Sequence, residues 1–409
     1  MFKKLLVIFL TSFCIFSVFS CSAPAEQNGY DGREYDISSS GDGRASLTVS
    51  KIGNDYSLTV SGSGRVVDYT NKEEVPWNVI TKRVTSVIIE DGVTNIGDYF
   101  FSATKLSEFI LPSSVEKIGE NSFPKGAVIY SYAEAEFDED YGYEIYYYSA
   151  EKPYAMNKYF RLVDGAPRVW REYSVLFIGN SFTFRQGTEE NPMVPYLFGK
   201  LADSFGEIVE VDFVVKSSYT LTKYADPKDE KGAVVEQKLT SSQYDYIVLQ
   251  EQSTKPVTDY NGFKTAVGKL TKRIGETQEK AEVFLYATWG YEGNNGLKNT
   301  SSKDIAEMNS KLKAAYDNCG AEYGLKVTHV GDAFLDIYTN HSEIQLYSAS
   351  DNFHQSNIGA YLSACCHLTA MLGIDVRNTT FSGDEFSGNF DETLCEILRE
   401  TAYSVSFVR

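Results

Sequence analysis

Three kinds of hydrophobic pattern divide the chain. An almost unbroken apolar run covers residues 5–19, short β-branched runs recur over residues 46–131, and apolar runs alternate with amphipathic stretches from residue 171 onward. Short apolar runs that alternate with longer helical patterns are typical of a parallel sheet covered by helices. The pattern therefore predicts an α/β domain over residues 171–409, preceded by a smaller β-rich unit.

The C-terminal part shows the alternation along its whole length. Apolar and β-branched runs predict strands at residues 174–178, 209–215, 244–250, 283–288 and 326–330. Apolar positions at spacings of three and four predict helices at residues 192–205, 260–277, 304–318, 358–372 and 391–404. This order predicts a three-layer α/β/α architecture, in which chemistry is placed on loops beyond the carboxyl ends of the strands.

Two segments of the β-rich unit repeat the same pattern 22 residues apart. The matching pairs are Val93 with Val115, Ile96 with Ile118, Gly97 with Gly119, and Phe101 with Phe123. This period is typical of leucine-rich solenoids, in which Val and Ile point inward, Gly makes the corner and Phe closes the coil. Because two repeats bury little core, a cap and the neighbouring chain are needed to complete it.

The repeats resemble the BspA-like leucine-rich repeats of bacterial surface proteins, and residues 58–64 resemble the N-terminal cap of that family. The resemblance covers residues 46–130 and implies a β-rich solenoid that binds a host or surface ligand, or serves as a stalk. Eight tyrosines follow among acidic residues in 132–159. We interpret residues 132–170 as a Tyr-rich linker, with an aromatic sugar-contacting surface as the alternative.

The first residues predict export. Lys3 and Lys4 precede the apolar run and Cys21 follows it, as in a secretory signal whose apolar region is short for a membrane span. The stretch before Cys21 resembles a lipoprotein cleavage box, which implies residues 1–21 as signal peptide and lipidation of Cys21. Cleavage after Ala25 and a retained helix are the alternatives, and all three place the folded domains outside the cytoplasm. Residues 22–45 read as a flexible linker.

Composition narrows the partners. The chain carries 38 Lys and Arg against 56 Asp and Glu, a net charge of -18, which repels phosphate backbones and anionic headgroups. We therefore expect no nucleic-acid binding, and membrane association only through the N-terminal lipid. The six cysteines form no C-x-x-C pair, so neither a metal site nor another cofactor is expected. Cys365 and Cys366 lie in an apolar helical run and are expected in the core.

A first chemical motif closes the first strand of the α/β domain, where Gly179-Asn180-Ser181 leads into a helix. A serine at such a turn can present its hydroxyl at a helix N-terminus, with its backbone N–H directed at a developing oxyanion. The same turn also serves as an ordinary helix cap in many proteins. The motif alone therefore leaves a structural role open.

A second motif near the end of the domain pairs Asp351 with His354. One helical turn brings a carboxylate to an imidazole three residues later, which leaves the other ring nitrogen free to take a proton from a serine hydroxyl. The chain has four histidines, and we find a carboxylate at this spacing for His354 alone. The pair is therefore the candidate acid–base unit.

Together the two motifs resemble the pattern of the SGNH (GDSL-like) hydrolase superfamily, over about residues 171–383. The match is closest to a branch of uncharacterised function that begins with Gly-Asn-Ser-Phe-Thr. The resemblance implies a flavodoxin-type three-layer sheet, with Ser181 as nucleophile, His354 as general base and then acid, and Asp351 as the group that orients His354. Ser181 and His354 should then lie about 2.6–3.2 Å apart.

Two positions depart from the superfamily pattern, which has a glycine after the second strand and an asparagine after the third. The corresponding segments here are residues 216–220 and 249–253, with neither residue in place. We assign Gln252 as the replacement amide donor, with Gln250 second because the two share a strand face. The Ser218 or Tyr219 backbone N–H would replace the glycine, with Asn180 beside them in the oxyanion or binding set.

These observations predict an exported serine esterase acting through an acyl-enzyme. Exported members of the superfamily often remove acetyl groups from carbohydrates, so the resemblance implies a carbohydrate O-acetyl esterase whose partner is an ester-bearing small molecule or an O-acetylated glycan. The loss of one oxyanion donor costs roughly 3 kcal/mol of transition-state stabilisation. A non-enzymatic surface adhesin with an inactive hydrolase-like domain is therefore the alternative. Trp289 lines the cleft or packs in the core.

Overall fold

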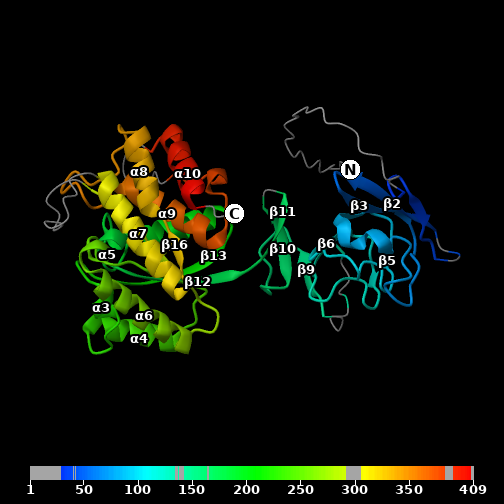
Figure 1. Ribbon diagram of the computed structural model, residues 1–409, viewed down its shortest axis with the longest axis horizontal. Helices are drawn as coiled ribbons and strands as arrows, with labels where there is room; N and C mark the ends of the chain where they lie inside the picture. Colours follow the sequence, from blue (N-terminus) through cyan, green and yellow to red (C-terminus); the bar gives the residue numbers. More distant parts are fainter. Residues whose placement is uncertain are drawn as a thin grey trace, which may run out of the picture. The chain divides into compact units, whose positions relative to one another are not determined.

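The computed structural model describes residues 29–39, 41, 43–133, 137, 142–163, 165–291, 305–382 and 390–406. The chain forms two compact units, the first ending at Val169 and the second beginning at Trp170 (Figure 1). The expected signal peptide with Cys21, and residues 22–28, 40 and 42 of the expected linker at 22–45, lie outside the described residues. The described part of that linker is folded, which corrects its interpretation: residues 34–36 form a strand of the first sheet and Ile37 is fully buried. Among the described helices, none is both long and apolar enough for a membrane span.

The described residues of the first unit form β-strands and the 3₁₀ helix η1. One sheet has the order β1-β2-β3-β4, made of β1 (Glu34–Asp36), β2 (Arg44–Ile52), β3 (Asp55–Ser63) and β4 (Val84–Ile89). A second has the order β11-β10-β9-β8-β6, made of β6 (Glu108–Leu111), β8 (Val128–Ser131), β9 (Glu144–Tyr148), β10 (Tyr159–Val163) and β11 (Ala166–Val169). The remaining elements are η1 (Asn78–Arg83), β5 (Asn95–Ile96) and β7 (Lys117–Ile118).

The 22-residue period corresponds to stacked coils. Ile96 of β5 pairs with Ile118 of β7 in a parallel ladder, and the side chains that the repeat pattern places inside are all buried. Phe101 and Phe123 stack with their ring centroids 5.9 Å apart. Gly97 is required at the corner, because a Cβ there would lie 2.0 Å from the carbonyl oxygen of Val67. The repeat therefore stacks one coil on the next.

The Tyr-rich segment belongs to this unit, which corrects its interpretation as a linker. Its strands β9, β10 and β11 extend the sheet from β8, and β8 and β9 are parallel like the preceding coils. Tyr143 packs edge-on against Phe123 with the ring centroids 5.5 Å apart, and its hydroxyl accepts a hydrogen bond from the Phe123 backbone N–H. The segment supplies the further coil that two repeats need in order to close their core.

The second unit is a parallel α/β sheet. Its strand order is β13-β12-β14-β15-β16, and all neighbouring strands run parallel. The strands are β12 (Glu172–Gly179), β13 (Ile208–Val215), β14 (Tyr246–Leu249), β15 (Glu282–Tyr286) and β16 (Lys326–Thr328). In chain order this is 2-1-3-4-5, the flavodoxin-type order. The expected α/β class with a parallel sheet is confirmed.

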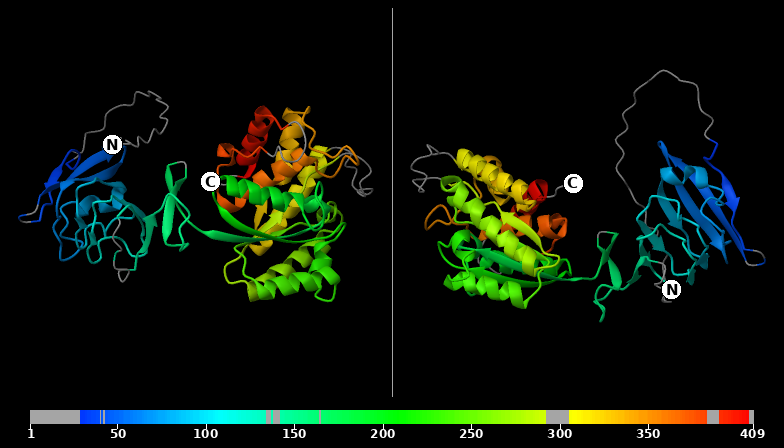
Figure 2. Two further views of the ribbon diagram at one scale, coloured as in Figure 1. Left: turned by 180° about the vertical axis from the view of Figure 1, so that it is seen from behind. Right: turned by 60° about the horizontal axis from the view of Figure 1, so that its bottom comes forward.

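Helices cover both faces of this sheet. They are α1 (Ser181–Phe184), α2 (Met193–Ser204), α3 (Leu221–Tyr224), α4 (Glu230–Ser241), α5 (Lys255–Thr258), α6 (Tyr260–Thr277), α7 (Ile305–Tyr323), α8 (Val330–Asn340), α9 (Asn357–Leu372) and α10 (Glu392–Ser406), with η3 (Val376–Asn378) before α10. Figures 1 and 2 show α8, α9 and α10 on one side of the sheet and α4 and α6 on the other. The apolar helix α9 is buried along almost its entire length, and Cys365 and Cys366 lie in the core as expected.

Candidate active site

The first strand ends in a tight turn that presents Ser181. Gly179 closes β12, and a Cβ at this position would lie 2.4 Å from the Thr183 hydroxyl oxygen and 2.7 Å from the Gln250 amide oxygen. Asn180 caps α1, with its Oδ1 accepting from the Phe182 N–H at 3.2 Å. Ser181 therefore occupies the first position of a helical turn, as the sequence motif predicts.

Asn180 is held from two neighbouring strands. Its backbone N–H donates to Gln250 Oε1 at 2.7 Å, and its side-chain Nδ2 donates to the Tyr219 carbonyl at 2.9 Å. The residue is buried, with 1% of its surface exposed. These bonds tie the loop after β12 to the loops after β13 and β14, so Asn180 fixes the position of the neighbouring Ser181.

Asp351 and His354 are hydrogen-bonded as predicted, although not within a helix. His354 Nδ1 lies 2.8 Å from Asp351 Oδ2. The other carboxylate oxygen accepts from the backbone N–H groups of Phe353 and His354, at 3.1 and 3.0 Å. Helix α9 begins only at Asn357, so the pair forms within a side-chain-stabilised turn before the helix. The hydrogen bond to Nδ1 leaves Nε2 as the free ring nitrogen of His354.

The surroundings set the charges of this pair. Burial lowers the pKa of His354 below its ordinary value; the Asp351 carboxylate opposes this shift, and the Arg185 guanidinium adds to it. Burial alone would raise the pKa of Asp351, but hydrogen bonds from the His354 ring and from the backbone N–H groups of His354 and Phe353 outweigh it and lower that pKa. At neutral pH, His354 is therefore a neutral base next to an ionised acid.

A second set of contacts ties the histidine loop to the serine helix. Arg185, which follows α1, forms an ion pair with Asp351 at 3.3 Å. Gln355 is fully buried, and its Nε2 lies 3.1–3.3 Å from the carbonyl oxygens of Ser181, Phe182 and Arg185. Neither Arg185 nor Gln355 was predicted from the sequence as part of the site. Their position next to the two motifs was the only available signal.

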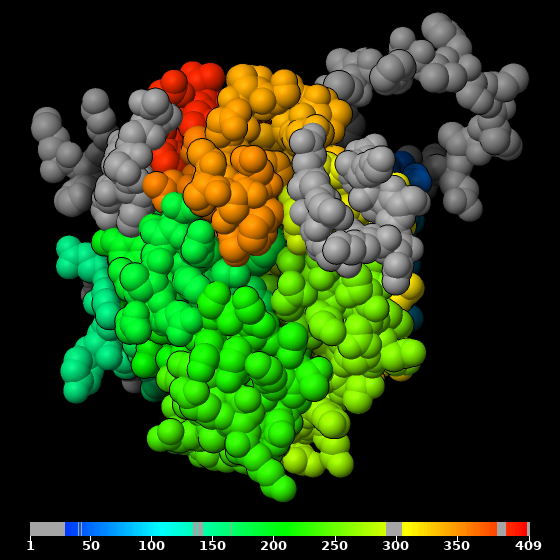
Figure 3. Space-filling model, turned by 90° about the vertical axis from the view of Figure 1, so that its left-hand side faces the viewer, coloured from blue at the N-terminus to red at the C-terminus, as the bar shows by residue number. Residues whose placement is uncertain are grey.

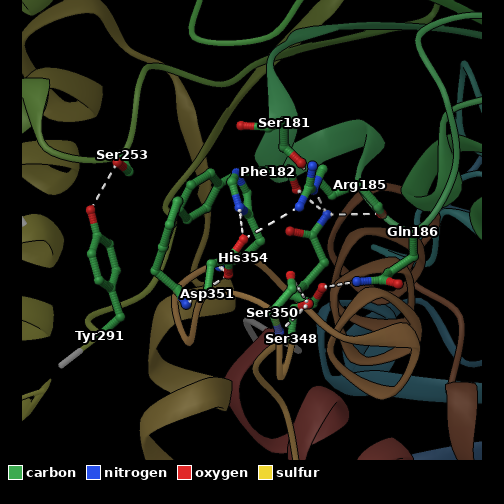
Figure 4. Close-up of polar contacts among 12 residues, drawn as sticks. Ser181, Phe182, Arg185, Gln186, Ser253, Tyr291, Ser348, Ser350, Asp351 and His354 are labelled. Carbon is green, nitrogen blue, oxygen red and sulfur yellow. Dashed lines mark hydrogen bonds and ion pairs between the residues drawn. The ribbon is translucent and has the colours of Figure 1, made fainter. Parts of the chain in front are cut away.

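Ser181 and His354 line one cleft of about 390 Å³. Figure 3 views this end of the unit, where orange segments around residue 350 meet green segments around residues 180–250. Figure 4 shows the His354 ring between the Asp351 carboxylate and Ser181. No hydrogen bond joins the Ser181 hydroxyl to His354, so the direct contact of 2.6–3.2 Å that was expected is not made in this structure. Catalytic hydrogen bonds are often long without a ligand and tighten in the substrate complex.

The loop after β13 supplies a backbone donor beside the serine. Ser218 lines the cleft and adopts a φ of +60°, the left-handed conformation that favours glycine. Its N–H donates to none of the described residues, whereas the Tyr219 N–H is bonded to the Lys216 carbonyl at 3.2 Å. Of the two predicted backbone donors, Ser218 is therefore the one available to a ligand.

The two glutamines after β14 have separate roles. Gln252 lines the cleft, and its Nε2 donates to the Ser253 hydroxyl at 3.1 Å, which leaves a second N–H on the same nitrogen. Gln250 is fully buried, with its Oε1 accepting from Asn180 and from the Thr183 hydroxyl, and it does not line the cleft. Strand β14 ends at Leu249, so the alternation that grouped the two glutamines does not extend to them. The assignment of Gln250 as a donor is corrected to a positioning role.

Trp289 and His329 make structural contacts and do not line the cleft. Trp289 is fully buried, stacks on Phe334 at 4.1 Å and donates through Nε1 to the Phe353 carbonyl, so it supports the histidine loop from the core. His329 Nε2 lies 2.6 Å from Asp317 Oδ1, a His–Asp pair that the search by spacing missed because its partners come from different elements. Among the described residues, no cluster of three or more His, Cys, Asp or Glu could hold a metal ion.

Comparison with known families identifies the repeats. The family described as BspA type leucine rich repeat region (6 copies) matches residues 80–134. The matched range holds both of the 22-residue segments, so the resemblance seen in the sequence is confirmed for them. No curated protein matches the chain.

Several solved structures are similar to part of this chain. A DUF4886 family protein from Bacteroides uniformis is 19% identical with a TM-score of 0.47, and the similarity covers 57% of this chain and 94% of that one. A lipase/acylhydrolase from Enterococcus faecalis is 17% identical with a TM-score of 0.36, covering 49% of this chain and 96% of that one.

Proposed function

We propose that the second unit is a serine hydrolase that cleaves esters through an acyl-enzyme. The observation that carries the proposal is the shared cleft: a serine at a helix N-terminus and a histidine oriented by a carboxylate line the same cavity. This combination of nucleophile, base and orienting acid is the arrangement that activates a serine hydroxyl.

We assign a role to each group, supported by its contacts. Ser181 Oγ attacks the ester carbonyl while His354 Nε2 takes the hydroxyl proton, and Asp351 stabilises the imidazolium that forms. The carbonyl oxygen becomes an oxyanion that accepts from the Ser181 and Ser218 N–H groups and from the Gln252 amide. His354 then returns the proton to the leaving alcohol. Water, activated by the same histidine, attacks the acyl-enzyme and regenerates Ser181.

We propose an O-acetylated carbohydrate as the substrate class. The support is the lining of the cleft: hydroxyl groups of Ser217, Ser218, Ser253 and Tyr291 contribute to it, and no Lys or Arg is among the described lining residues. Hydroxyl groups next to aromatic rings suit a neutral polyol, which offers both hydrogen-bonding groups and apolar ring faces. The predicted leader would place the enzyme outside the cytoplasm, anchored through Cys21.

The test of the proposal is the reaction of Ser181. The wild-type chain should hydrolyse p-nitrophenyl acetate and become labelled by a fluorophosphonate, and Ser181→Ala should lower kcat by about 10³-fold or more and abolish labelling. Ser253→Ala is the matched control, because Ser253 lines the same cleft without a histidine partner and should still be labelled at Ser181. Labelling that persists in Ser181→Ala, or an unreactive wild type, would contradict the assignment.

A further inference from the structure

Glu251 is a buried carboxylate next in sequence to the cleft residue Gln252, and the mechanism proposed above does not use it. It follows β14 by one residue beyond Gln250, and 1% of its surface is exposed. No basic side chain pairs with it among the described residues. Burying an ionised carboxylate without a paired cation costs free energy, and hydrogen bonds to the carboxylate must offset that cost.

The hydrogen bonds of Glu251 join two loops of the site. Both carboxylate oxygens lie within hydrogen-bond distance of the Leu221 N–H, at 3.1 and 3.2 Å, and Oε1 also accepts from the Gln252 N–H at 2.6 Å. Leu221 begins α3, three residues after Ser218, and Gln252 is the candidate amide donor. One carboxylate therefore holds the main chain of both loops that carry the oxyanion donors.

We propose that Glu251 is a positioning residue whose ionised carboxylate holds the Ser218 loop and Gln252 in the geometry needed for oxyanion stabilisation. The inference rests on the ester hydrolysis proposed above and adds a regulatory group to that site. Oxyanion donors act only when they are preorganised at the position where charge develops, so small displacements of either loop reduce the rate.

The ionisation of Glu251 falls in the physiological range. Burial raises its pKa to about 7, against the opposing effect of hydrogen bonds from the Gln252 and Leu221 N–H groups. Lys255 from α5 lowers this pKa and Asp259 raises it, and the Tyr316 hydroxyl from α7 also interacts with the carboxyl. Protonation converts one accepting oxygen into a hydroxyl, which leaves fewer acceptors for the two N–H groups. The loops are therefore held more tightly above pH 7 than below it.

Glu251→Gln tests the proposal kinetically, since an amide keeps the shape but has one accepting oxygen at every pH. In the full wild-type chain, kcat should rise about tenfold through a midpoint near pH 7, because partial misplacement costs less than the loss of a donor. In the variant, kcat should stay at the lower level, with only the His354 limb at acidic pH and with KM nearly unchanged. Glu282→Gln is the control and should keep the wild-type profile, because Glu282 is an exposed ion-pair partner at the amino-terminal end of β15. Superimposable profiles for wild type and Glu251→Gln would overturn the proposal.

A second measurement separates this inference from the proposed function, because it does not need activity. With ¹⁵N-labelled Leu and Gln in the full chain, the amide resonances of Leu221 and Gln252 should shift with pH about a midpoint near 7. Those shifts should be absent in Glu251→Gln. If these amide resonances do not titrate in the wild type, the positioning role of Glu251 is contradicted, even if the enzyme is active. Titrating amides in a chain without Ser181-dependent hydrolysis would support it while the proposed function fails.

Discussion

Ser218 has a backbone conformation that proteins usually leave to glycine. A non-glycine residue at a φ of +60° pays about 1–2 kcal/mol relative to glycine, because its Cβ approaches the following carbonyl oxygen. At this position the conformation accompanies a possible function, since Ser218 lines the same cleft as Ser181 and its N–H donates to none of the described residues. Strain of this kind at a cleft residue is a common sign of a functional loop.

The protonation of His354 leads to a prediction about Arg185. His354 acts as a base only when neutral, and its lowered pKa keeps it neutral until the pH falls below the ordinary histidine range. Arg185→Gln removes one cause of that lowering, so the pKa of His354 rises and the acid limb of kcat/KM moves to higher pH. The profile is best measured in the Glu251→Gln background, where the His354 limb stands alone. Arg185→Lys keeps the cation and should shift the limb less; a limb that moves to lower pH would refute the argument.

At the scale of elements, α1 is the part of the site that depends most on contacts from outside the element. A helix of four residues has too few internal hydrogen bonds to be stable alone. Its N-terminus is capped by Asn180, and the carbonyl groups of its turn are satisfied by Gln355 from the histidine loop. The nucleophile and the base are therefore positioned by one shared side chain.

Gln355 should be needed for catalysis without touching substrate. Gln355→Leu removes one donor from three carbonyl oxygens, although that of Ser181 keeps the Arg185 N–H and that of Phe182 keeps the Tyr286 hydroxyl. The loss should cost about 1 kcal/mol of unfolding free energy. The displaced α1 should lower kcat by about tenfold to a hundredfold with a smaller effect on KM. Gln355→Glu keeps the shape but turns an acceptor toward the same carbonyls, so it should be at least as harmful. Gln345→Leu, an exposed control, should be neutral. A Gln355→Leu enzyme with wild-type kcat would exclude the role.

The predictions for elements succeeded where the hydrophobic period is strong. Helix α6 has the predicted bounds, residues 260–277, because its buried positions recur every three or four residues. Helix α4 was not predicted, because it buries only Gly232, Val235 and Leu239 and its remaining surface is polar or half-exposed. Helix α8 was not predicted either, because the strand expected before it, at residues 326–330, extends into the helix start. Weak periodicity and short connections leave little signal in a single sequence.

At the scale of the whole molecule, each unit closes its own core. The second unit buries its five-stranded sheet between helices, and every cleft residue described above belongs to it. The first unit completes its solenoid with strands from the Tyr-rich segment. The core of the first unit is therefore built from residues up to Val169, and the core of the second unit from residues after that boundary, beginning at Trp170.

This division predicts that residues 170–409 fold and react without the repeats. The shortened chain should show the circular dichroism of a folded α/β protein, with the same fluorophosphonate labelling and the same kcat for p-nitrophenyl acetate as the full chain. The matching Ser181→Ala truncation serves as the blank. A truncated chain that is folded but unreactive would show that the first unit contributes to the site.

The sequence by itself determined the α/β class, the repeat, the turn at Ser181 and the Asp351–His354 pair. Each of these is written in local spacing: the alternation of apolar runs, a 22-residue period, and residues at most three apart. Only the tertiary structure decided that Gln250 is buried and positions Asn180, and that Gln355 contacts the serine helix. It also decided that Glu251 joins two loops and that the tyrosines complete the solenoid. These roles come from groups between about 20 and 175 residues apart, whose meeting depends on how strands and helices pack.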